Sequence, residues 1–112
     1  MSGEGFGVII KADEMKLCRG WVLRLLQYFQ LKQTREINDR VLKGSLEQVG
    51  HQITMPVLHA QIRYLEEKGY VETREPTTPD FPMLVCWITA KGIDLHEGSI
   101  EDVGVKFGDE DR

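Results

Sequence analysis

The sequence predicts a mainly helical α+β fold, with a three-helix core, a two-stranded β-hairpin and a short C-terminal helix. Three observations support this prediction. Apolar residues recur at steps of three and four in three stretches between residues 13 and 69. The pattern then changes to two β-prone runs, YVETRE and MLVCWIT, on either side of the Pro-rich loop PTTPDFP. The segment AKGIDLHEG, which follows Thr89, returns to helical spacing.

Length and composition indicate an ordinary globular protein. The chain has 112 residues, enough for one modest core, of which 41% are hydrophobic and 29% charged. No apolar run approaches the about 20 residues that a membrane span requires. The N-terminus, MSGEGFGVIIKADE, lacks the basic stretch and long apolar core of a secretory signal. We therefore expect a cytoplasmic protein with no membrane contact.

The chain divides into an arm, a domain and a tail. Residues 1–12 are Gly-rich and predict a flexible N-terminal arm, and Asp13 is the predicted N-cap of the first helix. The domain spans residues 13–98. The apolar residues of its first helix cover a wide arc, which predicts burial on more than one side and partly against a second subunit. These residues are Leu17, Cys18, Trp21, Val22, Leu25, Leu26 and Phe29.

The second helix is predicted after the polar connection QLKQTRE, with Thr34 or Asn38 as its N-cap. Gly50 is expected to end this helix in the left-handed conformation that glycine adopts without strain. The helix is predicted from the three- and four-residue spacing of Ile37, Val41, Leu42, Leu46 and Val49.

The third helix is predicted to begin after Thr54, its N-cap, and to end at Gly69. Pro56 falls in the first turn, where the missing N–H costs no hydrogen bond. The short segment GHQI separates the second helix from the third, which is helix-turn-helix spacing. With the hairpin as a wing and Thr89 as the cap of a closing helix, the order of elements is that of a winged helix-turn-helix. The inward stripe of the third helix is Leu58, Ile62 and Leu65.

Residues 99–112 predict an acidic, extended C-terminal tail. The net charge of −4 is unevenly distributed, because residues 54–112 hold six Lys/Arg against twelve Asp/Glu. An acidic end of this kind repels a phosphate backbone and favours a solvated segment. Four apolar residues give the tail the means to dock as an extended strand: Ile100, Val103, Val105 and Phe107.

Two segments carry a resemblance to known families. ITMPVLHAQIRYLEEKGYVE resembles the passage from the second helix to the wing in winged-helix transcription regulators, and WITAKGIDLHEG is similar to the segment that ends their wing. Over residues 13–106, the chain resembles a family of small winged-helix proteins of Mu-like phages and prophages. Some members of that family are labelled as arsenic-repressor-type regulators.

The resemblance implies transcription regulation by a homodimer that binds double-stranded DNA, with the third helix in the major groove and the wing on the backbone. Candidate DNA contacts in and before the third helix are Gln52, Thr54, Met55, Pro56, Val57, His59, Ala60 and Arg63. Candidate backbone contacts are Lys32, Arg35, Arg40, Lys43, Arg74, Thr77 and Thr78. Candidate dimer contacts are Leu17, Trp21, Val22, Phe29, Val105 and Phe107.

The candidate DNA face departs from the usual pattern of such regulators. Base edges are discriminated by bidentate Arg, Asn or Gln, whereas the third helix offers Thr54, His59 and Arg63. The wing holds Glu72, Glu75 and Asp80 against a single Arg74. Few neutralised phosphates predict weak affinity that falls quickly with salt. The alternative is a winged-helix protein–protein interaction module, an accessory or anti-repressor factor with a phage or host protein partner.

Each candidate contact also has a structural interpretation. His59 is alternatively an exposed surface histidine. Arg63 has the spacing to pair along its helix with Glu66 or Glu67 instead of binding DNA. Arg74 is alternatively paired with its acidic neighbours in the wing.

The sequence predicts no metal, no cofactor and no enzymatic activity. Cys18 and Cys86 lie far apart inside apolar patterns and are expected to be buried thiols. His51, His59 and His96 lie on three separate elements, which disfavours a shared metal site. The paired cysteines that sense metals in arsenic-repressor-type proteins are absent from the third helix. We find no glycine-rich phosphate loop and no nucleophile–base arrangement in the sequence.

Overall fold

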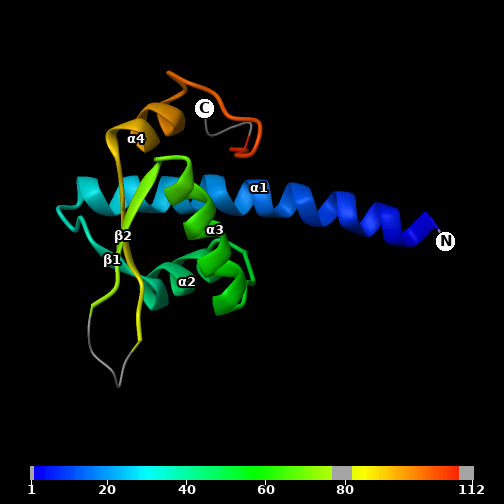
Figure 1. The fold of residues 1–112 in the computed structure, drawn as a ribbon, viewed down its shortest axis with the longest axis horizontal. Helices are drawn as coiled ribbons and strands as arrows, with labels where there is room; N and C mark the ends of the chain where they lie inside the picture. The colour runs from blue at the N-terminus through cyan, green and yellow to red at the C-terminus, as the bar shows by residue number, and fades with distance from the viewer. Residues whose placement is uncertain (1, 77–81, 109–112) are drawn as a thin grey trace.

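A long first helix organises the fold (Figure 1). The computed structural model describes residues 2–76 and 82–108, with side chains from residue 12 onward. Figure 1 shows α2 on one side of α1 and α4 with the C-terminal segment on the other, and the hairpin runs across α1 from one side to the other. The elements are α1 (Ser2–Leu31), β1 (Ile37–Asn38), α2 (Asp39–Gln48), α3 (Met55–Glu67), β2 (Val71–Arg74), β3 (Val85–Ile88) and α4 (Ala90–Glu97). The architecture is the mainly helical α+β fold that the sequence predicts.

Helix α1 is longer than the apolar pattern indicates. It begins at Ser2, so the prediction that Asp13 caps its N-terminus is wrong. The glycines in residues 2–12 weaken a helix by about 1 kcal/mol each relative to alanine but do not break it, and α1 contains no proline. Its N-terminal part extends away from the rest of the domain in Figure 1. The flexibility of residues 1–12 stays a prediction.

The core forms where the inner faces of α2, α3 and α4 and the sheet meet the C-terminal half of α1. Each fully buried leucine or isoleucine contributes about 1.5–3 kcal/mol relative to an exposed one. The stripe predicted for the third helix is confirmed as buried, and so are both thiols. Fully or almost fully buried residues include Cys18, Val22, Leu23, Leu26, Leu42, Leu46, Leu58, Ile62, Leu65, Cys86 and Leu95.

The helix-turn-helix has the predicted caps. The Asn38 side chain caps α2 by accepting a 2.9 Å hydrogen bond from the Val41 N–H. Gly50 has a φ of 95° and Gly69 a φ of 84°, so both helices are followed by a glycine in the left-handed conformation, as predicted. Ile37 lies in β1 and not in α2, which corrects the prediction that Ile37 is part of the second helix. The helix begins only at Asp39, because the backbone of Asn38 is still extended.

Within residues 2–76 and 82–108, the sheet has three antiparallel strands in the order β1–β3–β2, one more than the sequence predicts. In the hairpin, Val71 pairs with Ile88 and Arg74 pairs with Val85. The two-residue strand β1 pairs Ile37 with Cys86 on the other edge of β3. Two residues are too few to show an alternating pattern, which is why β1 was missed. The pairing ties the start of α2 to the wing.

The C-terminal segment docks on the fold through three of the four predicted residues, because Ile100 and Phe107 pack against the core and Val105 is part of it, whereas Val103 is exposed. Residues 99–108 form no strand, so the predicted strand form is wrong. The Lys106 N–H donates a 3.0 Å hydrogen bond to the Lys16 carbonyl oxygen, and Val105 is buried. A Cβ added at Gly20 would lie 2.0 Å from the Lys106 carbonyl oxygen, so the crossing requires glycine there. The Tyr70 hydroxyl donates a 2.6 Å hydrogen bond to Asp102. Contacts with α1 and with Tyr70, rather than pairing along a sheet edge, hold this segment.

Candidate nucleic-acid interface

The outward face of α3 lies beside the hairpin and carries the residues predicted to enter a DNA groove. Thr54 occupies the N-cap position, but its side chain makes no capping hydrogen bond. The hydroxyl therefore stays available for other partners. Gln52, in the preceding turn, is exposed. Thr54, Pro56 and Ala60 are exposed, and Met55, Val57, His59 and Arg63 are half-buried.

His59 is held by a buried carboxylate. Asp39, the first residue of α2, is only 3% exposed, and its Oδ2 lies 2.8 Å from His59 Nε2. The same oxygen accepts a 3.1 Å hydrogen bond from the Leu84 N–H, and the Asp39 N–H donates to the Leu84 carbonyl. Asp39 thus joins α2, α3 and the segment that leads into β3. His59 is a structural partner of Asp39 in this arrangement, with 41% of its side chain exposed.

Arg63 joins α3 to the wing. Its Nη1 donates 2.9 Å hydrogen bonds to Glu66 Oε1 and to Thr73 Oγ1, and its Nη2 contacts the Glu75 carboxylate. The hydrogen bond with Glu66 does most to raise the pKa of Arg63; burial opposes the rise, and the charges of Glu66 and Glu75 add to it. Arg63 therefore makes the helix pair expected from its spacing, together with a wing contact that the spacing did not reveal.

Glu66 belongs to the same cluster. The Thr73 hydroxyl donates a 2.6 Å hydrogen bond to Glu66 Oε2. This hydrogen bond is the largest cause of the lowered pKa of the Glu66 carboxyl; burial opposes it, and the hydrogen bond and charge of Arg63 reinforce it. The cluster holds Arg63 in one orientation.

Other candidate cations are also paired within the chain. Arg74 donates a 2.6 Å hydrogen bond to Glu36, which precedes β1, rather than to an acidic neighbour in the wing. Lys43 lies 2.7 Å from Glu47 one turn along α2. The Arg35 guanidinium lies 5.3 Å from the centre of the Trp87 ring, and the Lys32 ammonium 5.7 Å from that of Tyr28. Arg40 is exposed and forms no ion pair with the described residues. Thr77 and Thr78 lie outside the described residues.

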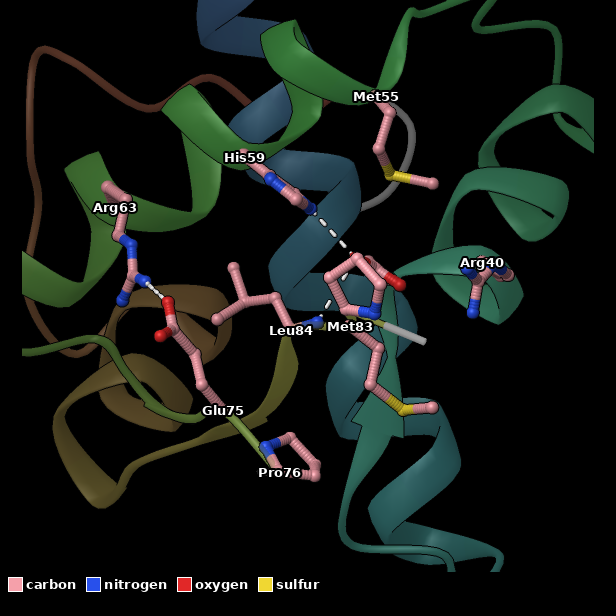
Figure 2. Close-up of a pocket in the computed structure, with 10 residues that line it drawn as sticks. Arg40, Met55, His59, Arg63, Glu75, Pro76, Met83 and Leu84 are labelled. Carbon is pink, nitrogen blue, oxygen red and sulfur yellow. Dashed lines mark hydrogen bonds and ion pairs between the residues drawn. The ribbon is translucent and has the colours of Figure 1, made fainter. Parts of the chain in front are cut away.

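A cavity of about 610 Å³ lies between α3 and the wing (Figure 2). Met55 and His59 reach it from α3, and Met83 and Leu84 reach it from the segment before β3. Arg63 and Glu75 close one side through their ion pair. The cavity thus has mostly apolar walls and is bordered by Asp39, Arg40 and this ion pair.

The candidate dimer contacts fall into two groups. Val22 is 0% exposed and Val105 is 6% exposed, so both are part of this chain's own core and have almost no surface left for a second subunit. Leu17, Trp21 and Phe29 on α1 are half-buried and stay predictions. Phe107 is half-buried and its ring lies 5.4 Å from that of His96.

The three histidines lie in different surroundings. His51 lies 6.0 Å from the Trp21 ring, His59 binds Asp39, and His96 contacts Gln27. Within residues 2–76 and 82–108, no three His, Cys, Asp or Glu side chains are grouped as a metal site requires. None of the helices in that part of the chain has the length and apolarity to cross a bilayer. Burial raises the pKa of the Cys18 thiol to about 11 and is the main cause of the rise at Cys86 to about 12, so both thiols are unreactive near neutral pH.

Sequence reasoning missed Asp39 and Thr73. An acidic residue in the first turn of a helix is usually solvated and favoured by the helix dipole, so nothing in the pattern marks Asp39 as buried. Thr73 was detectable: strand residues alternate between faces, which places Thr73 on the same side as the buried Val71.

Comparison with known proteins relates this chain to a solved structure. No family model matches this chain, and no curated protein matches it. Among solved structures, it is similar to the crystal structure of a PadR family transcriptional regulator from Eggerthella lenta DSM 2243. The TM-score is 0.57 at 20% sequence identity, over 86% of this chain and 83% of that chain. The fold is a winged helix-turn-helix. At this identity, the similarity of this winged helix-turn-helix protein to the PadR family protein concerns the fold alone.

Proposed function

We propose that this winged helix-turn-helix protein is a DNA-binding transcriptional regulator that binds double-stranded DNA as a homodimer. The observation that carries the proposal is the outward face of α3, which is exposed beside a β-hairpin with Arg63 at their junction. A helix presented beside a wing in this way fits the major groove. The similar solved structure is that of a protein described as a transcriptional regulator. A phage or prophage origin rests on the resemblance of residues 13–106.

The proposed base contacts come from the N-terminal part of α3. Gln52 and Thr54 are exposed and carry polar groups for base edges, while Met55 and Val57 offer apolar contact to a thymine methyl group. Arg63 contacts DNA by exchanging Glu75 for a phosphate or a base edge. Pro56, which follows Met55, lies in the first turn of α3, where its missing N–H costs the helix no hydrogen bond.

The proposed backbone contacts come from α2 and the wing. Arg40 and Lys43 lie on α2, and Arg74 lies on β2. Because Lys43 and Arg74 are bound to Glu47 and Glu36, each must lose a partner before it neutralises a phosphate. We therefore expect modest affinity. The slope of log affinity against log salt concentration is proportional to the number of neutralised phosphates, so few contacts give a shallow dependence on salt, which corrects the rapid fall expected from the sequence.

The test is DNA binding by the intact chain, measured across salt concentrations for the wild type, Arg63→Ala and Lys106→Ala. Lys106 pairs with Asp13 away from α3, so its replacement removes one positive charge without touching the proposed interface. We expect Arg63→Ala to weaken binding at least about fivefold, in the range of one charge-assisted contact, and Lys106→Ala to change it less than twofold. Equal affinities for the two variants exclude Arg63 from the interface.

A second candidate function is a protein-interaction module without direct DNA binding. It is favoured by the pairing of Arg63, Lys43 and Arg74 with carboxylates of their own chain, which leaves little positive charge for a phosphate backbone. The salt titration separates the two functions. Absence of binding at low salt, to specific and random DNA alike, supports the interaction module.

A further inference from the structure

We propose that the cavity between α3 and the wing is a binding site for a small organic cation with an apolar body and an N–H donor, such as an aromatic amidinium or amine. The cavity volume of about 610 Å³ lies within the range of about 300–1,000 Å³ that is usual for small-molecule sites. A flat junction between a helix and a wing would leave no volume of this size for a ligand. The proposal concerns a site for a small molecule, which shares Met55, His59 and Arg63 with the helix face proposed to contact DNA.

The carboxylate of Asp39 is the first reason for expecting a cation. Asp39 lines the cavity and is only 3% exposed. Its Oδ2 contacts His59 and the Leu84 N–H, but no Lys or Arg among the described residues pairs with it. Its Oδ1 is shielded from solvent and accepts no hydrogen bond from any described residue. Buried acceptors are normally satisfied, and buried carboxylates are normally paired with a cation. A ligand N–H⁺ group supplies both the hydrogen bond and the charge.

The apolar walls are the second reason, because they set the shape of the ligand. Met55 descends from α3 and Met83 lies on the opposite side of the cavity in Figure 2. Pro76 and Pro82 also contribute to the walls. Thioether sulfurs make favourable contacts with aromatic ring edges, and methionine side chains adjust easily to an irregular ligand. The two methionines can thus hold a flat ring and shift enough for its donor to reach Asp39.

The charges at the border favour a cation over an anion. The positive charge of Arg63 is already matched by Glu66 and Glu75, which both contact its guanidinium. Arg40 is the remaining cation of the cavity wall and is exposed to solvent, which screens it. An anionic ligand would lie beside the buried Asp39 carboxylate, which is an unfavourable contact. The cavity therefore discriminates by charge.

Occupation of the cavity would also oppose DNA binding, and this part of the inference rests on the proposed function. Met55, His59 and Arg63 belong both to the cavity wall and to the helix face proposed to enter the major groove. A ligand bound among these residues would occupy the space that the edge of the DNA major groove takes up in the complex, and it would hold Met55 and Met83 apart. The ligand would then release the protein from DNA by direct competition.

The test uses benzamidinium as the probe, with benzoate and benzyl alcohol as its anionic and neutral counterparts. The readout is the methyl NMR signals of ¹³C-methyl-methionine protein, whose chain contains four methionines. Met55 and Met83 line the cavity, whereas Met15 lies on α1 at a different surface hollow and serves as an internal control. We expect benzamidinium to shift the Met55 and Met83 signals saturably and to leave Met15 unchanged. Benzoate and benzyl alcohol should bind at least tenfold more weakly.

Two variants identify the carboxylate. Asp39→Asn should weaken benzamidinium binding at least tenfold, and Glu72→Gln, which removes an exposed charge from β2 outside the cavity wall, should change it less than threefold. The proposal is overturned if benzoate binds as well as benzamidinium, if Met15 shifts in parallel with the other two, or if Asp39→Asn binds benzamidinium as tightly as Glu72→Gln does. If Asp39→Asn does not fold, the three probes on the wild-type protein decide the question alone.

Competition is measured separately, by titrating benzamidinium chloride into the protein–DNA complex against sodium chloride of equal ionic strength. We expect DNA release beyond that caused by salt. If benzamidinium shifts the methyl signals of Met55 and Met83 but releases no more DNA than sodium chloride does, the competition is refuted and the cation site is still supported. Absence of DNA binding in the first place refutes the proposed function and the competition together, and the methyl signals still decide whether the cation binds.

Discussion

The Arg63 guanidinium on α3 contacts the carboxylate of Glu75, the residue that follows β2. This ion pair joins α3, the helix proposed to enter the major groove, to the wing. The side chains are 43% and 67% exposed, which places this pair at the surface. Surface pairs contribute at most about 1 kcal/mol, so DNA can displace Glu75 at small cost. This contact leads to the first prediction.

Replacing Glu75 should strengthen DNA binding. Glu75→Gln frees the Nη2 side of Arg63, and we expect affinity to rise about three- to fivefold, which corresponds to the loss of one surface ion pair. Glu72→Gln is the matched control, because it removes the same charge from an exposed position of β2. Both affinities are measured by fluorescence anisotropy at one salt concentration. An equal gain for the two variants would show that net charge, rather than the Arg63 contact, limits affinity.

His59 should matter more for stability than its partial exposure suggests. His59→Ala leaves the buried Asp39 carboxylate with one hydrogen-bond partner fewer, and we expect the free energy of unfolding to fall by about 1–3 kcal/mol. Gln52→Ala, an exposed change in the preceding turn, should change it by less than about 0.5 kcal/mol. Urea denaturation measures both values. A loss at His59 no larger than that at Gln52 would remove Asp39 from the contacts that stabilise the fold.

Two threonines at helix starts should differ in their contribution to stability. Thr89 accepts a hydrogen bond from the Gly92 N–H and donates one to the Gly69 carbonyl, whereas the Thr54 side chain makes no capping bond. Thr89→Ala should therefore cost about 1–2 kcal/mol of unfolding free energy and Thr54→Ala a few tenths at most. Thermal and urea denaturation check the order. A Thr54→Ala loss as large as that of Thr89→Ala would contradict the capping geometry.

The contact between Tyr70 and Asp102 should make stability depend on pH in two windows. Burial, then the hydrogen bond to Asp102, raises the pKa of Tyr70 from 10.0 to about 12, so its contribution is complete below pH 10 and is lost as pH rises towards 12. At Asp102, burial opposes but the Tyr70 hydrogen bond, the Gly104 N–H and nearby cations outweigh it, and its pKa falls below the ordinary 3.8. Its contribution is therefore present above pH 3.8 and is lost as pH falls through the lowered pKa.

Tyr70→Phe tests this pH dependence. We expect a loss of about 1.5–3 kcal/mol at neutral pH, the range for a hydrogen bond to a charged group, and a shallower decline of stability in acid. Tyr28→Phe removes the same hydroxyl from a side chain that is 53% exposed and should change neither. Unfolding free energies measured from pH 2 to pH 11 separate the variants. Parallel profiles for Tyr70→Phe and the wild type would contradict the role of the hydroxyl.

The parts of the fold that the sequence predicted depend on neighbours close in the chain. Asn38 caps the helix that follows it, and Gly50 and Gly69 end helices by their own backbone conformation, so three or four residues contain the whole signal. The apolar stripe of α3 was likewise predicted correctly, because periodicity needs no knowledge of the partner. In α2 the prediction holds for Leu42 and Leu46 and is wrong for Val41 and Val49, which are exposed. The same reasoning placed the hairpin strands.

The features of the fold that the sequence did not predict depend on contacts between residues far apart in the chain. Asp39 is buried because it meets Leu84, 45 positions later, and Arg74 finds Glu36, 38 positions earlier. The pairing of Arg63 with Glu75 requires the hairpin to fold back beside α3. Local sequence patterns predict which residues belong to the candidate site but not which ion pairs they form. These ion pairs determine how much unpaired positive charge is available to bind a ligand.

Helix α1 is a continuous rod from Ser2 to Leu31, and its C-terminal half is fixed in the core. Each residue of an α-helix turns the direction of its side chain by about 100°. A single residue inserted between Asp13 and Lys16 would therefore rotate everything ahead of it by that angle, without disturbing the winged domain. The rotation of residues 2–12 about the helix axis is therefore fixed by the part of α1 that packs in the core.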